Sequence, residues 1–269
     1  MIHPAETGLP LFHFNEAEIL SFALAFLRIG AFTFVWPIFS VYNVPGYLKV
    51  LLALSITMVV FPVIDRTGLT AQVLGQDIAW LAAKEVLTGL CLGFMTRLFF
   101  FAISVAGNLV ATSSGLANGQ LFNPALGATT TTVEQFYGAL ATLLFLSLNG
   151  HHYFLTGLVQ SFEAIPISID GTNFALMTSK FKDSGLILKL VVEAGVKMSA
   201  PVLVTIFIIN VVMGIISRAV PQINVLITSA PVNFMAALLI MMISIPALVF
   251  QMDHEIISFA EQLFKFMKV

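Results

Sequence analysis

The sequence predicts an all-α integral membrane protein made of helical hairpins, with bent and interrupted helices. Composition is the first reason: 58% of the 269 residues are apolar and only 10% are charged, against roughly 45–50% and about 25% in soluble proteins. Charge spacing is the second reason. Between Arg28 and Lys49 lie 20 uncharged residues, and between Arg218 and Asp253 lie 34, whereas about 20 apolar helical residues cross a bilayer core. A water-soluble globular domain is therefore excluded.

The charged residues and the cysteine exclude further classes. The chain carries 12 Lys and Arg against 14 Asp and Glu, for a net charge of -2. Because these charges are spread thinly, no basic surface for phosphates is expected, and nucleic acid is not an expected partner. Cys91 is the single cysteine, so an intramolecular disulfide and a cysteine zinc cluster are impossible. The first 18 residues hold three Glu and no Lys or Arg, unlike a signal peptide, so the N-terminus is expected to be retained.

One domain spanning 1–269 is expected, composed of successive apolar helices separated by turns. Pro37 and Pro45 bracket the first turn, because proline lacks an N–H and restricts the preceding residue. Thr131 and Glu134 have the spacing of a capping box, so a helix is expected to begin there. The last helix is expected to be amphipathic. The predicted helices cover 16–36, 48–64, 76–112, 132–148, 150–162, 184–217 and 231–252, with a C-terminal helix near 253–267.

The helix lengths fit a simple row of transmembrane helices poorly. Between Lys49 and Asp65 there are 15 residues, or about 22 Å of helix, which is too short to cross comfortably. From Ile78 to Thr112 there are 35 residues, or about 52 Å, which is too long unless the helix bends or leaves the bilayer. Some helices are therefore not expected to cross lipid in the conventional way.

Charged residues within the apolar stretches are the next signal, because they are costly in a membrane. Glu85, Gly89, Gly93 and Arg97 follow at a spacing of four and form a ridge on one helix face. Glycines at that spacing allow close approach of another backbone, so this ridge is predicted to contact a helix, including one from a partner.

Five further charged residues lie within apolar stretches. Glu193 and Lys197 have the spacing of a local ion pair on a helix. The whole set of predicted intramembrane charges is Arg28, Lys189, Glu193, Lys197 and Arg218.

The segment 113–127 has no charged residue and is rich in glycine and small residues. Exposed loops normally carry charges, whereas irregular backbone at membrane depth is tolerated only when buried in protein or lining a water-filled cavity. We therefore predict a buried or pore-facing loop. The alternative is an uncharged surface loop.

Residues with recognisable chemistry are few. His151 and His152 are adjacent, and adjacent helical positions point about 100° apart, so they do not form a metal pair. The sequence has neither a nucleophile elbow nor a phosphate-binding loop. We expect no enzymatic activity, no cofactor and no metal site.

With these residues assembled, the chain resembles the FliR family of flagellar type III export-gate subunits, which has close relatives in injectisomes. The most specific part is the Arg-x-x-Pro-Gln-x-Asn-Val pattern from Arg218 to Val225. The resemblance also rests on Arg28 with Pro37, Glu85 with Gly89 and Gly93, Gly115-Leu116 with Asn123-Pro124, Asn149-Gly150-His151-His152, Ala200-Pro201, Asn210 and Gly214.

The resemblance implies a gate subunit whose bent and interrupted helices are packed in a hetero-oligomer with FliP-like and FliQ-like subunits, and with an FlhB-like subunit, in the bacterial inner membrane at the flagellar basal body. Unfolded flagellar proteins would pass through the gate. It further implies a channel-closing loop that contains Ser113, Ser114, Gly115, Leu116, Gly119, Leu121 and Phe122.

The alternative function is a small secondary transporter with a substrate site at the membrane midplane. A transporter of that kind is expected to show a second copy of the 113–127 segment, and the sequence has no convincing one. Whether the chain serves a flagellum or an injectisome stays open at this level.

Overall fold

The computed structural model describes residues 16–38, 44–64, 71–115, 131–167, 184–220, 222 and 225–267. Over these residues it is helical and contains no strand, which confirms the all-α prediction. The helices are α1 (Glu16–Val35), α3 (Gly46–Val60), α4 (Ala71–Ser113), α6 (Thr132–Ser147), α7 (Gly150–Ala164), α9 (Ser184–Ala219) and α10 (Val225–Met267), with a short 3-10 turn, η1 (Phe61–Val63), after α3.

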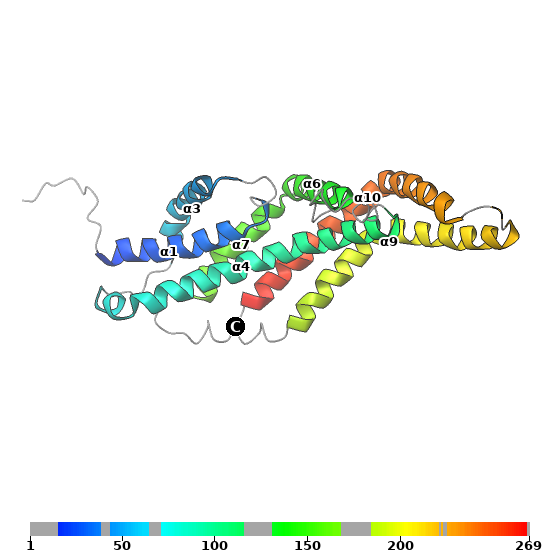
Figure 1. Ribbon diagram of the computed structural model, residues 1–269. Helices are drawn as coiled ribbons and strands as arrows, with labels where there is room; N and C mark the ends of the chain where they lie inside the picture. The colour runs from blue at the N-terminus through cyan, green and yellow to red at the C-terminus, as the bar shows by residue number, and fades with distance from the viewer. Residues whose placement is uncertain are drawn as a thin grey trace, which may run out of the picture.

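The molecule is elongated, and α4 forms its axis (Figure 1). With 43 residues, α4 is about 65 Å long at a rise of about 1.5 Å per residue. It packs against α1 along one half and against α6 and α9 along the other. The end of the α9–α10 hairpin projects beyond the other helices.

Five helices are long and apolar enough to cross a membrane, and they include α1, α3 with η1, and most of α4, α9 and α10. The chain is a membrane protein. Gly46–Val63 is the shortest of these segments at 18 residues, and Ile78–Ser113 the longest at 36. Their unequal lengths match the misfit already seen in the sequence, because a core about 30 Å thick fits neither extreme well.

The predicted C-terminal boundary is wrong. Residues 231–252 and 253–267 belong to the single helix α10, which contains Pro231 and Pro246 within its length. Charges at 253–255 suggested an end to the apolar helix, but Glu255 is buried and its Oε1 accepts a hydrogen bond from Gln251 Nε2 at 3.2 Å, one turn earlier. Ile256 is also buried, so the helix continues because the same face stays covered.

The start of α6 shows half of the predicted capping box. Thr131 has extended backbone, and its Oγ1 accepts a hydrogen bond from the Glu134 N–H at 3.1 Å. The Glu134 carboxylate does not complete the box; its Oε1 accepts a hydrogen bond from Ser104 Oγ on α4. Nearby, a Cβ on Gly107 would lie 2.8 Å from Glu134 Cα. The acidic side chain therefore joins α6 to α4 at a close approach.

An aromatic cluster holds four helices together. Phe99 of α4 lies with its ring centroid 5.9 Å from that of Phe145 of α6 and 5.8 Å from that of Phe259 of α10. Phe145 in turn stacks on Phe154 of α7 at 5.6 Å. These rings are buried, and aromatic pairs at such separations add to the stabilisation that burial provides.

Candidate functional site

The predicted glycine ridge on α4 lies against α1 of the same chain. A Cβ on Gly89 would lie 2.2 Å from the Arg28 carbonyl oxygen, and one on Gly93 would lie 2.8 Å from Val35 Cβ. Glycine is therefore required at both positions for the two helices to approach as closely as they do. Arg97, the last residue of the ridge, is exposed.

Arg28 lies at the centre of a buried polar site between α1, α4 and α7. Its Nε lies 2.6 Å from Glu85 Oε2, and both side chains are fully buried. Nη1 donates to the Ser161 carbonyl at 2.8 Å, and Nη2 donates to the Ile165 carbonyl at 2.7 Å. Its guanidinium carbon also lies 4.2 Å from the Phe162 ring centroid, a cation–π distance.

Lys84 completes what we call the buried charge cluster, formed by Arg28, Lys84 and Glu85. Its Nζ donates to the Pro166 carbonyl at 3.0 Å and lies 3.9 Å from Glu85 Oε1. The side chain is fully buried. Ile165 is the C-cap of α7 and Pro166 follows it, so the two cations bind carbonyls just beyond the end of the helix, where positive charge favours its dipole. The cluster therefore joins α1, α4 and α7 into one unit.

The sequence pointed to Arg28 and to Glu85 as separate features. It did not reveal that these two side chains pair with each other, nor that Lys84 takes part. A signal was present, because Lys84 interrupts the same apolar stretch as Glu85. Charged residues within membrane helices usually pair with one another or with backbone carbonyls. Here both kinds of partner are used.

The remaining predicted intramembrane charges lie on α9 and are exposed. Glu193 Oε1 and Lys197 Nζ form an ion pair at 2.8 Å, with about half of each side chain accessible. Lys189 and Arg218 are also exposed. An exposed i,i+4 pair of this kind contributes little to stability, in contrast to the buried charge cluster.

The predicted start of the channel-closing loop is one residue too early, because Ser113 is the last residue of α4 and Ser114 and Gly115 follow it. Ser114 Oγ donates to the Ala111 carbonyl at 3.1 Å, and Gly115 has a φ of 78°. Such a φ favours glycine and ends the helix. Leu116, Gly119, Leu121 and Phe122 lie outside the described residues.

The adjacent histidines on α7 stack edge to face, with ring centroids 4.3 Å apart. Partial burial and the neighbouring His152 lower the pKa of His151. Within the described part of the chain, no group of three or more His, Cys, Asp or Glu side chains could hold a metal ion.

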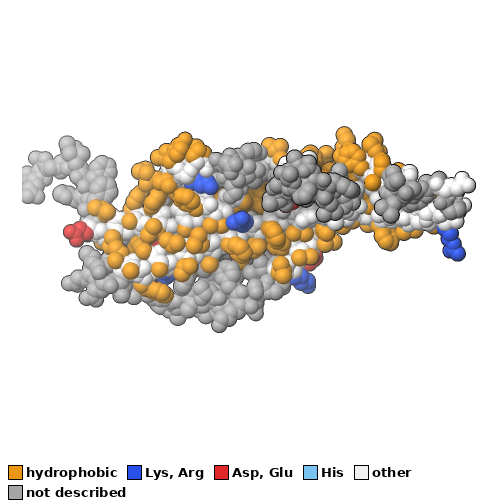
Figure 2. Space-filling view, in the orientation of Figure 1, with side chains coloured by type: hydrophobic (Ala, Val, Ile, Leu, Met, Phe, Trp, Pro, Cys, Tyr) orange, Lys and Arg blue, Asp and Glu red, His pale blue; other side chains and the backbone are white. Residues whose placement is uncertain are grey.

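Large apolar side chains cover much of the surface (Figure 2), and α9 and α10 carry many of them. On α9, Phe207 is 68% exposed and Ile215 is 65% exposed; on α10, Ile243 is 72% exposed and Phe250 is 77% exposed. Soluble monomers rarely present so much contiguous apolar surface. This surface is suited to lipid or to other membrane helices.

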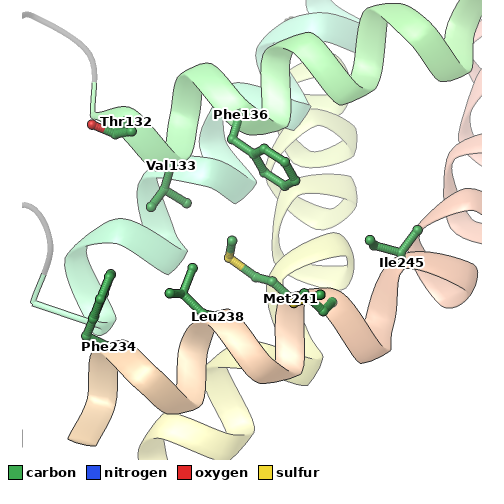
Figure 3. Close-up of a pocket in the computed structure, with 8 residues that line it drawn as sticks. Thr132, Val133, Phe136, Phe234, Leu238, Met241 and Ile245 are labelled. Atoms are coloured by element: carbon green, nitrogen blue, oxygen red, sulfur yellow. The ribbon is translucent and has the colours of Figure 1, made fainter. Parts of the chain in front are cut away.

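An apolar groove of about 390 Å³ lies between α6 and α10. Figure 3 shows Val133 and Phe136 of α6 facing Leu238 and Met241 of α10 across it. The hydroxyl group of Thr132 is the polar group among its lining side chains. The groove has no constellation of groups for catalysis.

The fold and the buried charge cluster define a helical membrane protein in which three buried charged side chains join helices. The model for bacterial export proteins, family 1, matches residues 19–258, and the chain belongs to this family. It is 30% identical over 243 residues to the flagellar biosynthetic protein FliR of Bacillus subtilis, which covers 88% of this chain and 90% of that protein.

Two other relatives show the breadth of the similarity. The flagellar biosynthetic protein FliR of Aquifex aeolicus is 27% identical over 248 residues, covering 91% of this chain and 93% of its own. The secretion system apparatus protein SsaT of Salmonella typhimurium is 23% identical over 231 residues, covering 85% of this chain and 88% of that protein. These relatives are named as flagellar biosynthetic proteins and as a secretion system apparatus protein, and none of the names is that of an enzyme, which is consistent with the sequence expectation.

Proposed function

We propose that this chain is a subunit of the flagellar type III protein export gate in the bacterial inner membrane at the flagellar basal body. It assembles with FliP-like and FliQ-like subunits and contacts an FlhB-like subunit. Unfolded flagellar proteins pass through the channel that these subunits form. Family membership supports the export role, and the supporting structural observation is the exposed apolar surface of the α9–α10 hairpin.

That surface is less covered than the apolar stretches of α1 and α4, although Gly46–Val63 is covered still less, with 17% of its residues buried. In the most apolar stretches of α9 and α10, 22% of the residues are buried within the chain, against 44% in α1 and α4. At the same time, α4 is about 65 Å long, roughly twice the thickness of a hydrocarbon core. A molecule of this length exposes apolar side chains beyond the lipid unless other proteins cover them. Assembly with other subunits provides that cover.

The proposed gate is closed by the segment from Ser113 to Phe122. It begins at the last residue of α4, and its sequence combines glycines with the apolar side chains Leu116, Leu121 and Phe122. Apolar side chains can narrow and dewet a channel, and glycines allow the backbone to change conformation when a substrate enters.

Assembly is tested by size-exclusion chromatography in mild detergent, with and without co-expressed FliP-like and FliQ-like subunits. We expect the chain alone to aggregate and the co-expressed chain to elute as a monodisperse complex, with both subunits identified by mass spectrometry. A long-lived monodisperse monomer that retains no partner contradicts the proposal. That result favours the transporter alternative.

The gate is tested by removing about five residues around Gly115, a change in loop length that the connected helices are expected to tolerate. We expect the complex to assemble and its ion conductance after reconstitution to increase, while Phe122→Ala gives a smaller increase. An assembled complex with unchanged conductance overturns the gate assignment and leaves assembly itself unaffected.

A further inference from the structure

A pair of amides joins α9 to α10 within the projecting hairpin. Asn233 Nδ2 donates to Asn210 Oδ1 at 2.9 Å. Asn233 is only 7% exposed, and its Oδ1 has no hydrogen-bond partner among the described residues. Asn210, by contrast, is exposed. Unsatisfied amide groups are costly in hydrocarbon, so this pair is poorly suited to contact with lipid tails.

Gly214 lies one helical turn after Asn210 on the same face of α9. A Cβ on Gly214 would meet nothing within 4 Å, whereas a Cβ on Gly89, Gly107 or Gly195 would lie less than 3 Å from a neighbouring helix. These three glycines are explained by packing within the chain. Packing within the chain does not explain Gly214, nor the equally open Gly30, Gly46 and Gly138, but Gly214 lies one turn from the Asn210–Asn233 hydrogen bond.

Ser217 extends this face by one further turn. Its Oγ donates to the Gly214 carbonyl at 2.8 Å, so the hydroxyl is already satisfied and the residue acts as a small side chain. The exposed α9 positions that flank these three residues, such as Phe207 and Val211, carry large apolar side chains. We call Asn210, Gly214 and Ser217 the small face of α9.

We propose that the small face of α9 docks a transmembrane helix from another subunit of the export apparatus. The docked helix approaches closely at Gly214 and forms a hydrogen bond with the Asn210–Asn233 amide pair. This inference rests on the proposed function and names one contact surface within it. Small residues permit close helix approach, and side-chain amides hydrogen-bond across membrane helices.

Two other occupants fit the face less well. A lipid tail has no hydrogen-bonding group for the amide pair. A second copy of this chain in the same membrane orientation would bring two α9 helices together in parallel about a two-fold axis. The exposed Arg218 residues of the two copies, next to Ser217, would then lie at the same level and repel each other. A helix of different sequence meets neither obstacle.

The test uses the full chain co-expressed with FliP-like and FliQ-like subunits. Gly214→Leu fills the open space at the small face, and its matched control is Gly138→Leu on α6, where a Cβ also meets nothing within 4 Å. We expect Gly214→Leu to reduce the amount of co-purified subunits about tenfold or more, and Gly138→Leu to change it less than about twofold.

A second variant removes the hydrogen-bonding groups without leaving one amide buried alone. Asn210→Leu/Asn233→Leu replaces both partners, which is far less costly to the fold than removing one. Co-purification is expected to fall about threefold to tenfold, the range given by one interhelical hydrogen bond in a membrane. Ser217→Ala is the control and is expected to change nothing.

Photo-crosslinking identifies the occupant. With benzoylphenylalanine at position 214, we expect an adduct with another subunit. Adducts with lipid only or with a second copy overturn the inference, as does an equal loss of co-purification for Gly214→Leu and Gly138→Leu. In those cases the unmodified complex still forms, and the proposed function stands. If the unmodified chain retains no subunits, both proposals fail together.

Discussion

The assembly of α1, α4 and α7 and the α9–α10 hairpin use their apolar side chains in opposite ways. The first region closes on itself: glycines bring α1 onto α4, and the buried charge cluster satisfies the end of α7. The second leaves most of its large side chains exposed, and its Glu193–Lys197 pair is accessible. The most apolar stretches of α9 and α10 have mean hydropathies of 2.4 and 2.3, against 1.7 and 1.9 in α1 and α4. The first region also contains a fully buried ion pair between two helices, Arg28 and Glu85.

Arg28→Met tests the first region most severely. It leaves Glu85 buried without its closest cation, and we expect a loss of about 3–5 kcal/mol of stability, the cost of breaking a buried ion pair. Thermal denaturation in detergent measures the loss. Lys197→Met, which breaks the exposed pair in the second region, is the control and is expected to leave the melting temperature unchanged. Equal effects of the two variants would remove the distinction between the regions.

Gly89→Ala tests the close approach of α1 and α4. The added methyl group would overlap the Arg28 carbonyl, so the helices must separate, at a cost of about 1–3 kcal/mol or more. Gly138→Ala adds the same group where nothing lies within 4 Å and is expected to be neutral or stabilising by up to about 1 kcal/mol. The two melting temperatures provide the comparison, and a neutral Gly89→Ala would contradict the tight packing.

Thr131→Ala tests the helix start that links the two regions. Loss of the Thr131 Oγ1 acceptor leaves the Glu134 N–H without its capping partner, and we expect a loss of about 1 kcal/mol. Thr131→Ser is the matched control, since it keeps the hydroxyl oxygen. If both variants destabilise α6 equally, the effect is one of packing and not of capping.

Phe207→Ala has the smallest expected effect on the isolated chain. Phe207 is 68% exposed, so its truncation should change stability by no more than about 0.5 kcal/mol. Phe99→Ala, by contrast, removes a fully buried ring and should cost about 3–5 kcal/mol. Denaturation of the two variants in the same detergent measures the difference. A large loss from Phe207→Ala would show that the hairpin is stabilised by contacts within the chain.

The sequence was sufficient to predict most helices, because charge spacing and apolar length are local properties. Residues 132–148, for instance, were assigned within about two residues of α6. The C-terminal boundary was wrong because burial of Glu255 depends on a distant part of the chain. A local pattern at 253–255 contains no information on that packing.

The candidate site was predictable only in part. Glu85, Gly89 and Gly93 were recognised as one helix face because the spacing of four is visible in the sequence. The residues that contact this site could not be recognised in the same way. Arg28 lies 57 residues from Glu85, and the carbonyls of Ser161 and Ile165 lie more than 130 residues from Arg28. Any residue can provide a backbone carbonyl, so the sequence could not show that the end of α7 provides the acceptors for Arg28.

Three prolines within helices give the two long regions different mechanical properties. Pro201 lies inside α9, and Pro231 and Pro246 lie inside α10, whereas α4 has none along its 43 residues. Each proline removes one backbone hydrogen bond and crowds the preceding turn, and Figure 1 shows both α9 and α10 changing direction along their length. The chain therefore combines α4, a long helix without proline, with the α9–α10 hairpin, whose helices can bend at three defined places without unfolding.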